Sequence, residues 1–130
     1  MSLNDPLANV LSHISMEDKK GKGKITVKPV SKMLKAVLGI LKDNKYLGEL
    51  KPVEESRGGA IELNLLGVIN SAGVIKPRYS VTLDTYKKFE QRYLPASGFG
   101  LLIVSTNKGL MTQEEAIKNK LGGRLIAYVY

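Results

Sequence analysis

Two polar segments near the carboxyl end of the chain carry the side chains best suited to contact an anionic partner. They are Ser105, Thr106, Asn107, Lys108 and Gly109, which follow an apolar run, and Gly122, Gly123 and Arg124, which precede another. Their hydroxyl and amide groups suit phosphate oxygens, ribose hydroxyls or base edges, and Lys108 and Arg124 add positive charge. Gly109 permits a positive φ and the close approach of a ligand. These residue types indicate a nucleic-acid contact.

An ordinary tight turn explains the first segment at least as well when spacing alone is considered, because Asn-Lys-Gly is favourable turn chemistry. The second segment favours a nucleic-acid contact over a simple turn. If residues 101–104 and 125–130 form neighbouring strands, both polar segments meet on one rim. Such a rim suits the minor groove of a folded RNA better than the major groove of DNA, because the sequence shows no exposed recognition helix with base-reading residues.

The charge balance favours the same class of partner. The 130 residues include 20 Lys and Arg against 12 Asp and Glu, which gives a formal net charge of +8. Seven lysines and no acid lie between Lys19 and Lys35. Such a concentration is typical of the electrostatic footprint of a nucleic-acid-binding protein. A lysine-rich solvated surface accounts for the same run, so the charge alone does not decide between the two.

Membrane attachment is not expected from this sequence. The basic run lacks the aromatic and leucine-rich anchors of an interfacial helix. No apolar stretch approaches the ~18–20 residues that span a bilayer, and the first residues lack the pattern of a secretory signal. The chain contains no cysteine, so a disulfide framework is excluded. A soluble cytoplasmic protein is therefore the expectation.

The same inventory argues against an enzyme, a metal site or an organic cofactor. His13 is the only histidine, and we expect it to be a partly buried structural residue beside the apolar face of the first helix. One histidine and no cysteine cannot build the common zinc sites. Residues 21–24 resemble a phosphate-binding loop in composition only, because the Walker spacing is missing. No acid/base pair stands out, so no small-molecule substrate is predicted.

Two other classes of function remain open at this stage. A small basic enzyme that processes nucleotides or RNA is the alternative, and it requires a paired acid/base constellation. A protein-interaction module is the third possibility. Its charge would serve an acidic partner, and it would show no preference for RNA shape over any other polyanion.

The pattern of the first 70 residues predicts a helix-strand-helix-strand-strand domain, with two helices on one face of a small sheet. Asp5 and Pro6 supply a cap and a first helical residue. Apolar residues at helical spacing continue this helix until about Met16, before a mobile loop of charges and glycines. The second helix begins after Ser31, with Lys32 on its solvent face. Strands are expected at residues 25–28, 46–53 and 60–66.

The remaining residues predict a mostly β domain with one short helix. A bridging strand is expected within residues 67–73 and extended chain at 75–81, whereas Tyr86–Tyr93 fits either a short helix or irregular chain. Thr112 and Glu115 form a capping box for the short helix, and Gly122-Gly123 closes it with left-handed backbone. The expected fold class is α+β, with an amino-terminal α/β domain at residues 1–70 and a carboxy-terminal, mostly β RNA-binding domain at 71–130.

Residues 98–112 closely resemble the signature of small-ribosomal-subunit protein eight, in the order Gly-Phe-Gly-Leu-Leu-Ile-Val-Ser-Thr-Asn-Lys-Gly-Leu-Met-Thr. Residues 121–130 resemble the end of that family. Asp5-Pro6-Leu7-Ala8 and Ser31-Lys32 match its amino-terminal half in kind and order. Arg124 and residues 86–95 resemble the archaeal or eukaryotic branch, since many bacterial members have an acid where Arg124 stands.

The resemblance implies a two-domain α/β protein that binds directly to the central domain of small-subunit rRNA and joins early in assembly. It implies that the target is a distorted stem with an irregular internal loop, contacted mainly by the carboxy-terminal domain through the minor groove. Neighbouring small-subunit proteins would be the other partners. The positions that the resemblance carries over as RNA-binding are Ser105, Thr106, Asn107, Lys108, Gly109, Gly122, Gly123, Arg124, Tyr86, Asp5, Pro6 and Lys32.

Overall fold

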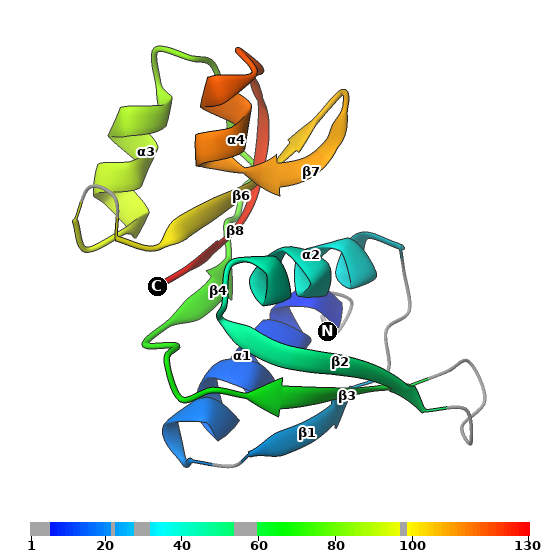
Figure 1. Cartoon of the computed structure of the whole chain (residues 1–130). Coiled ribbons are helices and arrows are strands. Elements are labelled where there is room, and N and C mark those ends of the chain that lie inside the picture. Colours follow the sequence, from blue (N-terminus) through cyan, green and yellow to red (C-terminus); the bar gives the residue numbers. More distant parts are fainter. Residues whose placement is uncertain (1–5, 22, 28–31, 54–59, 97–98) are drawn as a thin grey trace. The chain divides into compact units, whose positions relative to one another are not determined.

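The computed structural model describes residues 6–21, 23–27, 32–53, 60–96 and 99–130 (Figure 1). The chain divides into two compact units, residues 1–70 and residues 71–130. Each unit contains its own antiparallel sheet. Among the helices of the described ranges, none combines the length and the apolar character that a membrane span requires.

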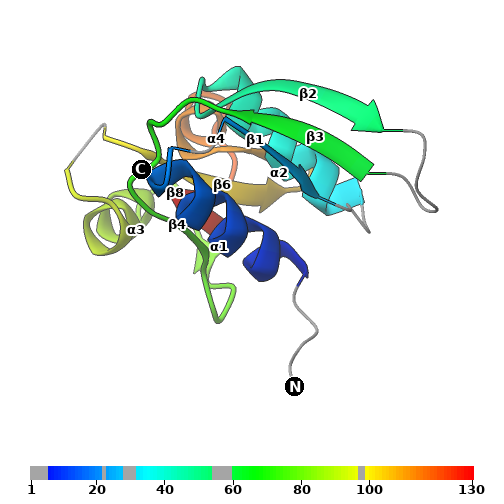
Figure 2. The ribbon, with the colours of Figure 1, turned by 90° about the horizontal axis from the view of Figure 1, so that it is seen from below.

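The first unit packs two helices against a three-stranded sheet. Its elements are α1 (Pro6–Lys19), β1 (Lys24–Val27), α2 (Lys32–Asp43), β2 (Leu47–Val53) and β3 (Ala60–Leu65). β3 is the central strand, and both views place the two helices on the same side of the sheet (Figure 1 and Figure 2). The buried helical residues are Leu7, Leu11 and Ile14 in α1 and Leu34, Val37, Leu38 and Leu41 in α2. Helical periodicity therefore predicted the faces that form this core.

The first helix extends further than its local pattern indicates. We expected it to end near Met16, but α1 continues to Lys19 and includes Asp18. The carboxylate of Asp18 is buried, and its two oxygens accept hydrogen bonds from the backbone N–H groups of Gly67 (2.8 Å) and Ile69 (2.9 Å). Because these donors lie about fifty positions further along the chain, no local signal reveals them. The distant partners hold the last turn of α1 in place.

The second unit is mostly β, as the sequence predicts. Its elements are β4 (Ala72–Val74), β5 (Ser80–Val81), α3 (Tyr86–Tyr93), β6 (Leu101–Thr106), β7 (Gly109–Thr112), α4 (Gln113–Lys118) and β8 (Gly123–Val129). The strand order is β4-β8-β6-β7, and β5 also pairs with β8. α4 is the expected short helix, and the segment that fitted either a helix or irregular chain is helical as α3. The α+β class is therefore confirmed.

α3 is stabilised as a helix because one of its faces packs into the core of the second unit. Tyr86 and Phe89 are buried in a cluster with Leu102 and Val104 of β6 and Leu125 of β8. Most of the remaining side chains of α3 are polar, so the short helix is strongly amphipathic. Burial of two aromatic side chains, each worth roughly 2–3 kcal/mol, stabilises a helix that is too short to form alone.

The start of α4 shows the Thr112 half of the expected capping box, and its end differs from the expectation. The side chain of Thr112 accepts a hydrogen bond from the backbone N–H of Glu115 at 3.3 Å, as a capping residue does. We expected Gly122 and Gly123 to close the helix with left-handed backbone. The left-handed residue after α4 is instead Lys120, with φ of 57°.

The two glycines are required for a different reason, which is the close approach of neighbouring strands. A Cβ added to Gly122 would lie 2.7 Å from the carbonyl oxygen of Val81, and one added to Gly123 would overlap the carbonyl oxygen of Ser105. Only residues without a side chain allow β5, β8 and β6 to pair at this point.

Candidate nucleic-acid interface

The first polar segment forms the end of the β6–β7 hairpin. Thr106 pairs with Gly109 across the hairpin, so Asn107 and Lys108 are the two residues of the turn. Gly109 has a φ of 109°, which a residue with a side chain adopts only with strain. The segment is thus a tight turn, as its spacing indicated, and the turn presents the polar side chains at its tip.

The hydroxyl of Thr106 fixes the geometry of this turn. It donates a hydrogen bond to the carbonyl oxygen of Gly109 at 2.8 Å and accepts one from the backbone N–H of Lys108 at 3.1 Å. Because its single proton is engaged within the hairpin, only an acceptor site of the hydroxyl remains for a ligand. Thr106 therefore contributes to an interface mainly by shaping it.

Asn107 and Lys108 lie exposed at the turn, and their side chains are available for contact. Neither side chain has a hydrogen-bond or ion-pair partner among the described residues. An exposed amide offers both donors and an acceptor, and the lysine offers three donors and a charge. The tip of the hairpin thus combines the two kinds of group that contact base edges and phosphates.

Strand pairing brings the second polar segment beside the first. Ser105 of β6 lies opposite Arg124 of β8, and Arg124 in turn lies opposite Ser80 of β5. Directly opposed residues of an antiparallel sheet project from the same face. The three form a continuous polar row across three strands, which we call the Ser80–Arg124–Ser105 row.

This row lies on the face of the sheet that points away from α3 and α4. Val104 and Leu125, the chain neighbours of Ser105 and Arg124, are buried in the cluster beneath the helices. Because side chains alternate along a strand, Ser105 and Arg124 project to the opposite side. Ser80 and Arg124 are exposed and Ser105 is half-buried, so the row is accessible from the same end of the sheet as the hairpin turn.

Arg124 and Lys108 supply the positive charge of this surface. Within the described ranges, no carboxylate lies within ion-pair distance of either side chain. A guanidinium has five donors in a fixed fork that matches the geometry of a phosphate. The turn and the row together form a polar, positively charged surface whose backbone is held by a β ladder.

Tyr86 does not belong to this surface. The resemblance gave it an RNA-facing role, but its side chain is 1% exposed and its hydroxyl donates a 2.7 Å hydrogen bond to the carbonyl oxygen of Leu121. Burial raises the pKa of its phenol. The position is a core residue that ties α3 to the chain after α4, and the RNA-facing assignment is wrong for this fold.

The amino-terminal candidates are described only in part. Asp5 lies outside the described residues, and Pro6 begins α1. Lys32 begins α2 and is exposed. Ser80 belongs to the surface but was missed, because its segment indicated only extended chain and its position opposite Arg124 depends on strand pairing.

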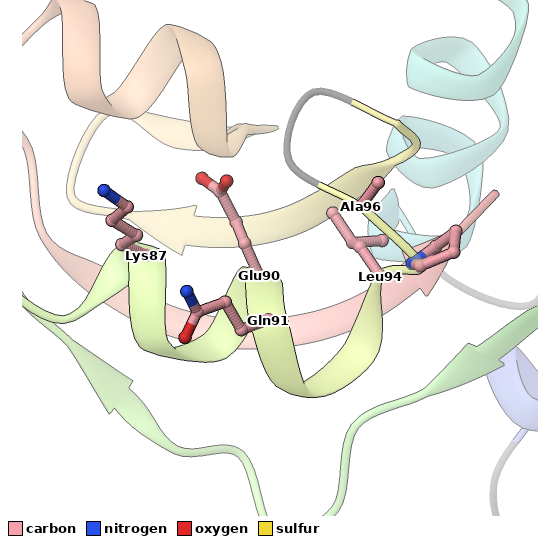
Figure 3. Close-up of a pocket in the computed structure, with 6 residues that line it drawn as sticks. Lys87, Glu90, Gln91, Leu94 and Ala96 are labelled. Carbon is pink, nitrogen blue, oxygen red and sulfur yellow. The ribbon is translucent and has the colours of Figure 1, made fainter.

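A small cavity of about 140 Å³ lies beside α3 (Figure 3). Its lining residues are Lys87, Glu90, Gln91, Leu94, Pro95 and Ala96. Burial, and then the nearby Glu114, raise the pKa of the Glu90 carboxyl, while Lys87 lowers it. The lining holds a single carboxylate and a single lysine, and it shares no residue with the hairpin or the row.

His13 and the acids of the described ranges assemble no metal centre. We expected His13 to be partly buried, but its side chain is 47% exposed and lies 4.0 Å from the Glu17 carboxylate on the surface of α1. Among the described residues, no three His, Cys, Asp or Glu side chains gather closely enough to hold a metal ion.

Comparison with known protein families adds a finding that covers both units. Residues 5–130 match the family model of ribosomal protein S8. The match includes the hairpin, the Ser80–Arg124–Ser105 row and the start of α2. Members of this family are small-subunit ribosomal proteins that bind rRNA and assemble with other ribosomal proteins. Because the match extends over nearly the whole chain, this protein belongs to the ribosomal protein S8 family.

Proposed function

We propose that this protein binds directly to the central domain of small-subunit rRNA and joins the subunit early in its assembly. The observation that carries the proposal is the pairing of Ser105 with Arg124 beside the β6–β7 turn. This pairing joins two segments far apart in the sequence into one polar, positively charged surface. On this proposal the protein acts on the ribosome, in the cytoplasm, beside neighbouring small-subunit proteins.

The geometry supports recognition of a shallow RNA groove. The two-residue turn projects Asn107 and Lys108 beyond the strands, while the row offers hydroxyls and a guanidinium on an open sheet face. The minor groove of A-form RNA is wide and shallow and displays 2′-hydroxyls and base edges. The Arg124 and Lys108 cations would hold the flanking phosphates, and the asparagine and the row serines would contact sugars and bases.

The enzyme alternative receives less support from the same structure. The cavity beside α3 offers one carboxylate with a raised pKa and one lysine, and it lies apart from the turn and the row. A general acid/base mechanism requires groups that converge on one reacting atom. The proposed role is therefore that of a structural rRNA-binding protein without catalytic activity. Arg124 and residues 86–95 favour the archaeal or eukaryotic branch of the family.

The direct test is binding to a central-domain rRNA fragment at moderate salt, with bulk transfer RNA or heparin as competitor. We expect the cognate complex to survive competition that removes nonspecific complexes, because shape and base contacts add to the salt-sensitive phosphate contacts. Equal displacement by either competitor would contradict the proposal and favour the interaction module. Chemical alteration of the RNA or of nucleotides by the pure protein would favour the enzyme.

The site itself is tested by replacing the two exposed residues of the turn. The double variant Asn107→Ala, Lys108→Ala removes an amide and a charge and should lower cognate affinity by roughly ten- to a hundredfold, since each contact contributes about 0.5–1.5 kcal/mol. Lys118→Ala is the control, because Lys118 is an exposed lysine in the last turn of α4. A double variant that binds no worse than the Lys118 control would place the site elsewhere.

A further inference from the structure

A cluster of aromatic and basic side chains lies on α3, apart from the hairpin and the row. The guanidinium of Arg92 lies 5.0 Å from the centre of the Tyr79 ring and 5.4 Å from the centre of the Tyr93 ring. One of its nitrogens also donates a 3.4 Å hydrogen bond to the Tyr79 hydroxyl. Two cation–π contacts hold this arginine in a fixed orientation. We call Arg92, Tyr79 and Tyr93 the arginine platform.

The platform joins two groups of packed aromatic rings. Tyr79 packs against Phe89 with ring centres 5.4 Å apart. Tyr93 stacks on Tyr128 at 5.7 Å, and Tyr128 stacks on Tyr130 at 6.2 Å. The backbone carbonyl of Tyr79 also accepts a hydrogen bond from the Leu125 N–H at 2.9 Å, which ties the platform to β8. A guanidinium supported in this way loses little freedom when it binds a ligand.

The surface around the platform carries further positive charge. Lys88 lies one helical turn before Arg92 on the same side of α3, and Arg78 precedes Tyr79; all three cations are exposed. No carboxylate of the described residues lies within ion-pair distance of any of them. Like charges at i and i+4 repel each other. An anion bound between them would remove that repulsion.

The one acid of α3 lies on the opposite side of the helix. Glu90 is about 160° around the helix from both Lys88 and Arg92, at 100° per residue. Figure 3 shows the Glu90 side chain beside that of Lys87, at the cavity. The helix thus separates its acid from its basic face, so the cations on that face are not neutralised from within α3.

The platform lies on the face of the second sheet opposite to the Ser80–Arg124–Ser105 row, and it extends from Tyr79, beside the row, to Tyr93 at the far end of β8. Tyr128, on which Tyr93 stacks, pairs with Leu102 at the start of β6, whereas Arg124 pairs with Ser105 near its end. Tyr128 and Arg124 are four residues apart on β8, which is roughly 13 Å along the strand. Tyr128 packs against the core beneath the helices, and Arg124 projects to the other face. A single shallow groove cannot contact both surfaces.

We infer that the arginine platform binds the phosphodiester backbone of a second RNA segment, outside the stem held by the hairpin. This inference rests on the proposed function, because it assumes that the hairpin and the row bind rRNA. Arg92 supplies the fork of donors that contacts phosphate oxygens. Lys88 and Arg78 neutralise the adjoining phosphates, and the tyrosines keep the fork oriented toward the ligand.

The test compares two RNA probes, the isolated stem with its internal loop and a transcript of the whole central domain. Arg92→Gln keeps a polar, though shorter, side chain and removes the charge and the fork. We expect it to lower affinity for the whole central domain by about three- to tenfold, the loss that corresponds to one exposed contact. The dependence of affinity on salt should also weaken by roughly one counterion for that probe. Affinity for the isolated stem should stay unchanged.

Two further variants keep the result interpretable. Lys118→Gln removes one positive charge from the exposed surface of α4 and should leave the affinity for both probes nearly unchanged. Arg92→Lys keeps the charge but loses the planar fork and the stacking, and it should recover less than half of the lost affinity in logarithmic terms. Each variant is compared with the wild type at equal folded fraction, measured by melting.

The outcomes separate the inference from the proposed function. An equal loss for both probes, no loss for either, or a loss matched by Lys118→Gln would each overturn the second-segment contact while leaving the hairpin site intact. A further outcome would also overturn the second-segment contact. In that outcome the Asn107, Lys108 double variant loses stem binding, while Arg92→Gln binds both probes as the wild type does. Failure of the wild type to distinguish the central domain from bulk transfer RNA would instead overturn the proposed function.

Discussion

At the scale of single residues, the hydroxyl of Thr106 shows how a polar side chain can serve both the fold and the interface. Its proton is used within the turn, where it bonds the carbonyl oxygen of Gly109, and its oxygen also holds the Lys108 N–H. From the sequence alone, the same hydroxyl looks free to contact RNA. In the structure, its main role is to hold the turn residues Asn107 and Lys108 in a fixed geometry.

Thr106→Val therefore should damage the interface through the turn. The substitution keeps the branched shape but removes both hydrogen bonds, and it should lower the free energy of unfolding by about 1 kcal/mol. RNA affinity should fall by roughly five- to a hundredfold, or about 1–3 kcal/mol, because the two turn residues lose their fixed orientation. Melting and rRNA-fragment binding measure the two effects.

Thr106→Ser is the matched control, since it keeps the hydroxyl and removes only a methyl group. It should retain most of the affinity and most of the stability. A valine variant that binds as the wild type does would show that neither the hydroxyl nor the order of the turn matters. The assignment of the hairpin as the RNA-binding site would then fail.

At the scale of elements, the sequence best predicts those features of a helix that depend on residues within one or two helical turns. The apolar faces of α1 and α2 follow from helical spacing, and the start of α4 follows from Thr112 and the residue three positions later. The end of α1 depends on the bonds from Asp18 to Gly67 and Ile69, far along the chain. Local periodicity carries no information about such partners.

The same reasoning applies to the candidate site. The polar turn was visible in the sequence because its residues are contiguous, whereas Ser80 became part of the site only through its pairing with Arg124. Tyr86 was assigned to the surface by resemblance, but the hydrophobic cluster of the second unit takes up its ring. The position of Ser80 and the burial of Tyr86 both depend on packing between distant segments, which the spacing of residues along the chain does not reveal.

Gly123→Ala tests whether the close approach of β8 and β6 builds the site. The added Cβ would overlap the Ser105 carbonyl oxygen, which is backbone and cannot rotate away. We expect the strands to separate locally, with a loss of about 1–3 kcal/mol in unfolding free energy and a large loss of RNA binding. Thermal melting and affinity for the rRNA stem are the measurements.

Gly39→Ala is the contrasting variant, because Gly39 lies within α2 and an added Cβ meets nothing within 4 Å. There the substitution should raise stability by roughly 0.5–1 kcal/mol through helix propensity and leave binding unchanged. If Gly123→Ala behaved as Gly39→Ala does, close strand approach would not be what requires glycine at that point of the site.

At the scale of the whole molecule, the net charge of +8 is distributed over both units. The first turn of α2 contains Lys32 and Lys35 and no acid. A cation at the amino end of a helix faces the positive end of the helix dipole, which costs about 0.3–1 kcal/mol at low ionic strength. The free protein thus carries a small destabilising arrangement in its first unit, and a bound phosphate would relieve it.

Lys32→Ala should therefore change stability and affinity in opposite directions. Removal of the exposed cation lessens the repulsion with the helix dipole, so the free protein should melt slightly higher at low salt. RNA affinity should fall modestly, by about two- to fivefold, and to a similar extent for matched and mismatched stems, because a phosphate contact positions the RNA without reading its bases. The slope of log affinity against log salt should decrease by roughly one. A loss confined to the matched stem would show that Lys32 reads sequence or shape, and an unchanged slope would show that it meets no phosphate. In either case the first unit would contribute to binding by some means other than a charge-based phosphate contact.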